Sequence, residues 1–279
     1  MKPYFLALLC LPFVPACNNV SGTRTEEKAD SPLSAVPARP RSTEDSAATN
    51  LRLAMESTLS PDRDDISIPS FGLKKVMAAI RQLREKEGGR DADGFTIALS
   101  DTAYNALTFA EKFTYNLIHG EDYSQMCDAL PARPDPEHRI YGQTADFFGE
   151  FSWSKRQLNF FRNNRDSVGQ LTKAVIDEQG KVGMNLIDAI VEANATDMIP
   201  YLIDIDRKDN SNHYILTALL LLMEKNNYPE FTSSVSYTKL YKSDRGTYSA
   251  YLVYNKANED LIIQRATNFY NTREGAPKP

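Results

Sequence analysis

The amino-acid sequence predicts an all-α fold, a compact array of helical hairpins that follows a disordered N-terminal tether. Apolar residues recur at helical spacing through most of residues 51–279, and turn-forming residues interrupt them at short intervals. The composition, 42% hydrophobic and 25% charged over 279 residues, is typical of a folded protein with a sizeable core. The formal net charge of −5 argues against a nucleic-acid partner.

The first sixteen residues predict a secretory signal peptide. A single positive charge at Lys2 precedes an apolar run over residues 4–16, which ends in small residues. The run is interrupted by two prolines and is shorter than the roughly 20 residues that a membrane-spanning helix needs. We therefore expect this segment to direct export rather than to span a bilayer.

The end of this segment carries a recognisable motif. Residues 14–17 read Val-Pro-Ala-Cys, which resembles the lipobox of bacterial lipoproteins. The resemblance covers only the first 17 residues and implies cleavage between Ala16 and Cys17. It also implies a diacylglyceryl group on the Cys17 thiol and an acyl chain such as palmitate on the new amine. The next residue is Asn18 rather than Asp, which in this class favours the outer membrane.

Residues 17–50 predict a lipidated cysteine and a flexible linker. Residues 18–50 hold no aromatic residue and few large aliphatic ones, so they cannot bury enough apolar surface to offset the entropy of ordering. A random coil of this length spans about 30 Å. The folded domain is therefore predicted over residues 51–279, where Cys127 is the remaining cysteine of the mature chain and is expected to be a packed residue.

Local signals place the first helices of the domain. Ser70 is expected to cap a helix that starts near Phe71 and stops at two glycines, residues 88 and 89. Thr108 and Glu111 have the spacing of a capping box, so a second helix should follow and end at Gly120. Three prolines between residues 131 and 136 then predict a long loop to about residue 140.

Helices are predicted to dominate residues 147–227. The densest aromatic cluster of the chain, at residues 147–161, could form a ligand platform, but its helical spacing favours a place in the core. Gly180 and Gly183 should flank a turn. Residues 214–223 are apolar almost all round, which predicts the most buried helix of the domain.

Weak self-similarity runs through the same region. Residues 158–175, 187–205 and 219–235 each contain an apolar stripe, an Asn-containing turn and a second stripe. The pattern fits either a short solenoid of stacked hairpins or a set of unrelated helices.

If the repeats are real, three turn residues would cap successive hairpins on one side: Asn163, Asn194 and Asn226. A protein partner would then dock between about residues 159 and 227. The exposed charges that it would meet are expected at Arg162, Glu192 and Glu224.

The tyrosine-rich segment over residues 235–254 allows two interpretations. Alternating residues from Tyr248 to Tyr254 could form a β-hairpin with a turn at residues 243–246, which would make the fold mainly α with a small C-terminal hairpin. A helix that continues from Tyr248 to Phe269 fits the spacing too. We favour the helix, because no other strand is predicted as a partner.

The chain shows no catalytic, metal-binding or cofactor-binding signature. None of the three histidines has the spacing of a metal motif, and Asp91, Asp93 and Gly94 do not complete a calcium loop. The nearest approach to a polar site is His119 with Glu121 and Asp122. This cluster could supply acid–base or metal-binding groups, or it could be a helix end followed by an acidic turn.

Together these observations predict a lipid-anchored protein of the bacterial cell envelope that acts as a binding or structural module. It would contact the membrane through the lipid on Cys17 and would bind a protein partner in the envelope. The alternative is an envelope hydrolase or a metal-dependent enzyme that uses the region of His119, Glu121 and Asp122.

Overall fold

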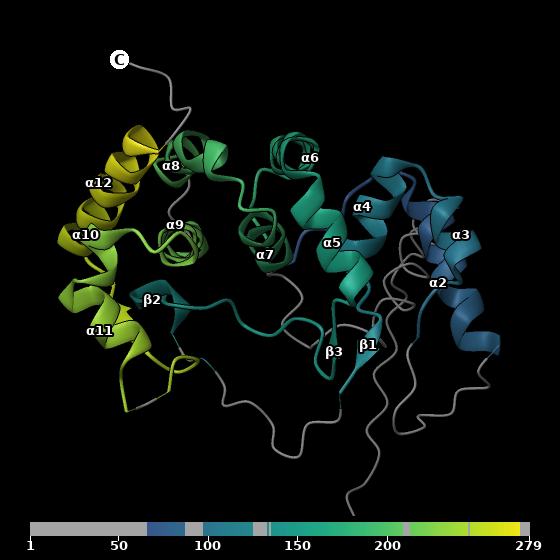
Figure 1. Cartoon of the computed structure of the whole chain (residues 1–279), viewed down its shortest axis with the longest axis horizontal. Helices are drawn as coiled ribbons and strands as arrows, with labels where there is room; N and C mark the ends of the chain where they lie inside the picture. The colour runs from purple at the N-terminus through teal and green to yellow at the C-terminus, as the bar shows by residue number, and fades with distance from the viewer. Residues whose placement is uncertain are drawn as a thin grey trace, which may run out of the picture. The chain divides into compact units, whose positions relative to one another are not determined.

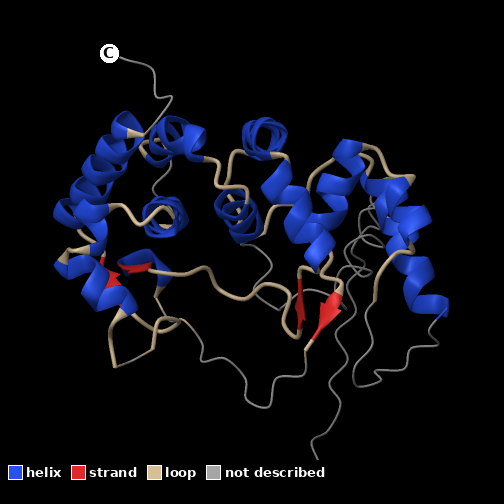
Figure 2. Ribbon diagram, in the orientation of Figure 1, coloured by secondary structure: helices blue, strands red, loops and turns tan. Residues whose placement is uncertain are grey.

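The chain folds into a mainly α-helical domain with two small two-stranded sheets (Figure 2). This confirms the predicted fold class in its mainly α form. No helix in the described residues is long and apolar enough to cross a membrane. The computed structural model describes residues 66–86, 97–124, 133, 135–208, 213–244 and 246–273. The predictions for the signal peptide, Cys17, the tether, the Asp91–Gly94 loop and Cys127 concern residues outside these ranges.

The first helices are α2 (Leu73–Lys86), α3 (Asp101–Asn105) and α4 (Phe109–Ile118). The capping box of α4 is confirmed, because the Glu111 amide donates to the Thr108 hydroxyl at 3.3 Å and the Thr108 amide donates to the Glu111 carboxylate at 2.8 Å. The predicted start of α2 was wrong by about two residues. Gly72 has a φ of +60°, outside helical geometry, and the Ser70 hydroxyl donates to Glu178 instead of capping the helix.

Three helical hairpins follow, and their inner helices form the centre of the core. In Figure 1, α6 lies beside α7 and α8 lies beside α9. The inner helices α7 and α9 pack against each other. Helix α9 is buried along most of its length, as its apolar sequence predicts. The six helices are α5 (Lys155–Asn163), α6 (Arg165–Gln179), α7 (Met184–Glu192), α8 (Ile199–Asp206, after the 3-10 turn η3, Thr196–Met198), α9 (Tyr214–Lys225) and α10 (Pro229–Thr232).

The turns after α7 and α9 have the same structure, 33 positions apart. The Ala195 amide donates to the carbonyl of Ile190 at 3.0 Å, and the Tyr228 amide donates to the carbonyl of Met223 at 2.9 Å. Asn194 and Asn227 occupy the left-handed region at the corresponding position, with φ of +52° and +50°.

The self-similarity is therefore real for the second and third hairpins. The left-handed residue of the third turn is Asn227. Asn226, which was predicted to cap this hairpin, precedes it directly after the end of α9. The first hairpin differs, because only Asn164 separates α5 from α6, and its φ is −130°. A one-residue connection leaves no room for the turn that the other two hairpins share.

Two short sheets join segments far apart in the chain. Strand β1 (Asp122–Tyr123) pairs with β3 (Phe151–Ser152). Strand β2 (Arg139–Tyr141, after the 3-10 turn η2, Pro136–His138) pairs with β4 (Tyr251–Val253), both antiparallel.

The preferred helical interpretation of the segment after Tyr248 was therefore wrong. So was the hairpin alternative, since β4 pairs with β2 and not with a neighbouring strand. The predicted loop to residue 140 ends where β2 begins. Helix α11 (Val235–Tyr241) precedes the segment. Helix α12 (Lys256–Thr272) starts only after its N-cap Asn255, whose side chain accepts from the Asn258 amide at 2.9 Å.

The first described residues are clamped onto the start of α7. The Asn185 side chain accepts from the Ser67 amide at 2.9 Å and donates to the Ser67 carbonyl at 2.7 Å, as a neighbouring strand would. The Gly183 amide donates to the Ser67 hydroxyl at 3.0 Å. A Cβ atom at position 183 would lie 2.3 Å from the Ser67 nitrogen, so only glycine permits this close approach.

Candidate functional site

The structure separates the three residues of the sequence-predicted polar cluster. Glu121 is 1% exposed and directly precedes β1, whereas Asp122, the first residue of β1, is exposed. His119 is buried at the end of α4. The three residues therefore do not share one accessible face.

The Glu121 carboxylate is engaged by donors on both oxygens. The partly exposed Arg156 forms an ion pair with this buried carboxylate and donates from Nε to Oε2 at 2.8 Å. The Ser154 hydroxyl donates to Oε2 at 2.5 Å, and the Tyr115 hydroxyl donates to Oε1 at 2.8 Å. Burial, followed by the charge of Glu121, raises the pKa of Tyr115, so this phenol stays a donor.

The same network joins four separate elements. Arg156, in the first turn of α5, also bonds to Asp101 of α3 and to the Leu99 carbonyl. His119 Nε2 lies 2.6 Å from the Ile97 carbonyl oxygen, so this nitrogen carries the proton. The cluster is thus a structural network, which leaves Glu121 no free lone pair for catalysis. Among the described residues, no group of three metal-ligating side chains is gathered anywhere.

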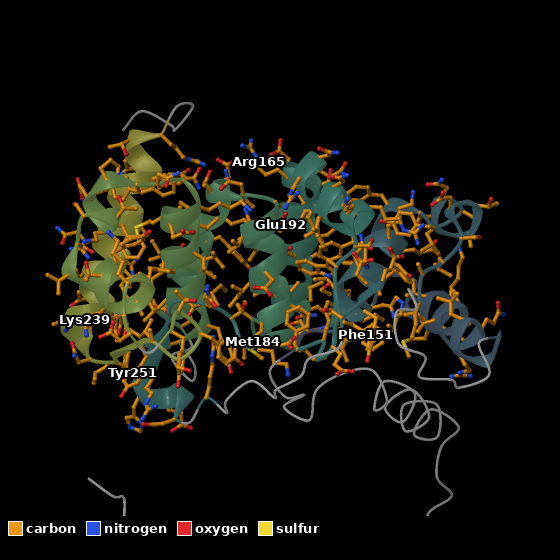
Figure 3. The ribbon with its side chains drawn as sticks, turned by 60° about the horizontal axis from the view of Figure 1, so that its bottom comes forward. Phe151, Arg165, Met184, Glu192, Lys239 and Tyr251 are labelled. Atoms are coloured by element: carbon orange, nitrogen blue, oxygen red, sulfur yellow. The ribbon has the colours of Figure 1, made fainter. Side chains whose placement is uncertain are left out.

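A second region, which we call the turn edge, comprises the C-terminal ends of α5, α7 and α9 with the turns that follow them. Glu192 at the end of α7 pairs with Arg162 of α5 and, at 3.3 Å, with Lys225 of α9. Asn194 and Asn226 exchange two side-chain hydrogen bonds of 3.1 and 2.7 Å. Figure 3 shows Arg165 near Glu192 at this end of α7, with Met184 at the other end.

The turns are thus brought side by side, as the repeat hypothesis requires. Between the first two turns lies a polar groove of about 590 Å³. Arg162 is exposed, as predicted, although it pairs with Glu192; the prediction that Glu192 is exposed was wrong, since its side chain is only 16% exposed. Glu224 is partly buried. The groove is lined by Arg162, Asn163, Asn164, Arg165, Asp166, Ser167, Ala193 and Asn194.

A third region, which we call the aromatic pocket, was not predicted as a site. It is a cavity of about 310 Å³ between the loop before β3, the middle of α7 and the loop before β4. The aromatic cluster was expected in the core, and part of it is there, but several of its rings also line this cavity. The lining is Thr144, Ala145, Asp146, Phe147, Phe148, Phe151, Ser152, Trp153, Asp188 and Tyr248.

Asp188 of α7 is the most perturbed group of the aromatic pocket. Burial raises its pKa to about 7, and the charge of Glu192 acts in the same direction. The Thr144 hydroxyl, which donates to Oδ1 at 2.6 Å, and the charge of Arg133 oppose this shift. Burial also raises the pKa of Asp146, against two backbone amides that donate to it.

Asp206 at the end of α8 is a buried carboxylate with a raised pKa. It is 2% exposed, and no group in the described residues donates to either of its oxygens. Burial, and then the charge of Glu259, raises its pKa to about 6. Unlike Asp188, it lines none of the pockets described above.

One sequence signal could have pointed to Asp188. It is the one charged residue in the apolar stretch of α7 from Met184 to Val191, and the residues on either side of it in the helix are buried.

Comparison with models of protein families, with curated proteins and with solved structures found no match.

Proposed function

We propose that this protein is a lipid-anchored component of the bacterial cell envelope that binds a protein partner at the turn edge. The anchor is a lipid on Cys17 in the outer membrane, supported by the Val-Pro-Ala-Cys motif at residues 14–17 and by Asn18. Residues 18–50 would hold the domain away from the bilayer and let it rotate.

The observation that carries the binding role is the alignment of the turns. The Asn194–Asn226 pair and the Arg162–Glu192–Lys225 ion pairs hold successive hairpins in register. Stacked helical repeats vary their turns without harming the core, and they use such edges to bind other proteins. The open groove between the first two turns offers amides, the Ser167 hydroxyl and both signs of charge to a partner.

The geometry favours this role over an enzyme built on His119, Glu121 and Asp122. A general acid or base needs a lone pair or proton that can reach the substrate. Glu121 is bound by Arg156, Ser154 and Tyr115, and Asp122 lies apart from it on an exposed face.

The anchor is tested with the cysteines. Cys17→Ala should abolish incorporation of radiolabelled palmitate and move the protein from the membrane to the soluble fraction. Cys127→Ala is the matched control, because it removes another thiol of the mature chain and should leave the label unchanged. A wild-type protein that takes up no label would refute the anchor.

The turn edge is tested with two exposed groove residues, Asn163 and Ser167. Photo-cross-linking in intact cells should yield a defined adduct with an envelope protein. The double variant Asn163→Lys/Ser167→Lys should weaken this adduct at least about tenfold, typical of a disturbed interface centre. Its melting temperature should stay within a few degrees of the wild type.

The matched control adds the same two charges to an exposed face of α12, as Gln264→Lys/Asn268→Lys. It should leave the adduct intact. Equal cross-linking in both double variants would exclude the groove as the docking site.

A further inference from the structure

We propose that the aromatic pocket binds an organic ammonium cation, with Asp188 as its counter-ion. The cation is an alkylammonium group, carried either by a small amine or by a lysine side chain of a partner. This site is separate from the turn edge, and it shares no lining residue with the polar groove.

The charges of the pocket select a cation. The charged residues of its lining are Asp146 and Asp188, both acidic. The charge of Arg133 also acts on Asp188, but Arg133 does not line the pocket; its guanidinium donates to the Gln143 carbonyl at 2.6 Å and stacks on the Tyr248 ring at 3.9 Å. An anionic ligand would be repelled by two carboxylates. An ammonium group could donate to the Asp188 carboxylate, which accepts one hydrogen bond, from the Thr144 hydroxyl.

The walls of the pocket favour the same ligand. Five aromatic side chains line it, and aromatic ring faces attract cations most strongly where water is displaced. The volume of about 310 Å³ is at the lower end of ligand pockets, so it suits one head group with a short alkyl chain.

The protonation state of Asp188 makes the binding depend on pH. The groups that act on Asp188 are Thr144 and Asp146 from the loop before β3, Glu192 from its own helix, and Arg133. Because the carboxyl loses its proton near pH 7, the counter-ion is mostly formed at pH 8 and mostly absent at pH 6. Affinity should therefore fall about tenfold between these two values.

The chain contains a built-in probe, because Trp153 is its single tryptophan and lines the pocket. The experiment titrates the full chain at pH 8 with butylammonium and with 1-butanol, an uncharged ligand of the same size, and follows tryptophan fluorescence. A second arm compares a peptide with a central lysine against the same peptide with norleucine.

The proposal expects a saturable change with butylammonium at millimolar concentration or with the lysine peptide, and none with 1-butanol or the norleucine peptide. Binding of butylammonium indicates a small amine, and binding of the peptide alone indicates a partner's lysine. Asp188→Asn should weaken binding at least about tenfold and remove its pH dependence. Asp206→Asn, which neutralises a buried carboxylate elsewhere, should bind as the wild type does.

Two results would overturn the proposal. One is a fluorescence change of equal size with charged and uncharged ligands, or of equal size in Asp188→Asn and in the wild type. Either would indicate a cavity that binds apolar groups without using the carboxylate. The other is the absence of any saturable change with both cations. Because the cross-linking experiment uses different residues, either proposal can fail while the other stands.

Discussion

Glu121 is a buried carboxylate, whereas Asp188 is a partly exposed one at the wall of the aromatic pocket, and their surroundings differ. Glu121 has a guanidinium and two hydroxyls on its oxygens, whereas Asp188 has one hydroxyl from Thr144. A buried charge that is fully paired holds elements together, and one that is partly paired raises its pKa and weakens the fold. The difference distinguishes a network that maintains the structure from a carboxylate that is available to a ligand.

The largest effect is expected at Glu121. Glu121→Gln keeps the size of the side chain but leaves the charge of Arg156 without its buried partner. We expect a loss of about 4 kcal/mol in the free energy of unfolding, measured by urea denaturation. The neighbouring Asp122→Asn is the control and should change stability by less than about 0.5 kcal/mol, because Asp122 is exposed. Similar values for both variants would break the comparison.

The opposite sign is expected at Asp188. Asp188→Asn should raise the free energy of unfolding by about 3 kcal/mol at pH 8, because it removes a desolvated charge while Thr144 keeps an acceptor. A decrease in stability at pH 8 would show that the carboxylate is needed by the fold.

The same residue sets a slope of stability against pH. Since the pKa of Asp188 rises from 3.8 unfolded to about 7 folded, the folded state binds the extra proton between these values. Its contribution is fully present below pH 4 and is lost as the pH rises to 7. The difference between wild type and Asp188→Asn should therefore grow from pH 4 to pH 7 and then stay constant. Denaturation curves across this range measure it.

The smallest effect is expected at the turn edge. Asn226→Ala removes the two hydrogen bonds to Asn194 and should lower the free energy of unfolding by about 1 kcal/mol. Asn163→Ala, at the exposed C-terminal end of α5, should change it by less than about 0.5 kcal/mol. If thermal unfolding gives equal values for the two, the stacked turns add no stability.

Features encoded by nearby residues could be predicted from the sequence. The capping box of α4 depends on Thr108 and Glu111, three positions apart, and it is formed. The buried helix α9 and the turns that hold Asn194 and Asn227 likewise follow from short stretches of sequence.

Features that join distant residues could not be predicted. Strand β4 exists because Leu252 meets Ile140, and each strand has only three residues, too few to give a periodic signal. The pKa of Asp188 depends first on burial and then on Thr144, which another part of the chain brings to α7. The sequence contains the members of the pocket but not their proximity.

The clamp between Ser67 and Asn185 has a mechanical consequence. A pulling force applied to the chain before Ile66 would load two hydrogen bonds in parallel at the start of α7, near the centre of the core. The force would act on α7 before it acts on α2, because α2 follows Ser67 in the chain. Helix α2 would therefore not have to separate from the domain first. Asn185→Ala should therefore lower the force at which the domain yields in a single-molecule pulling experiment, because tension would pass to α2 first.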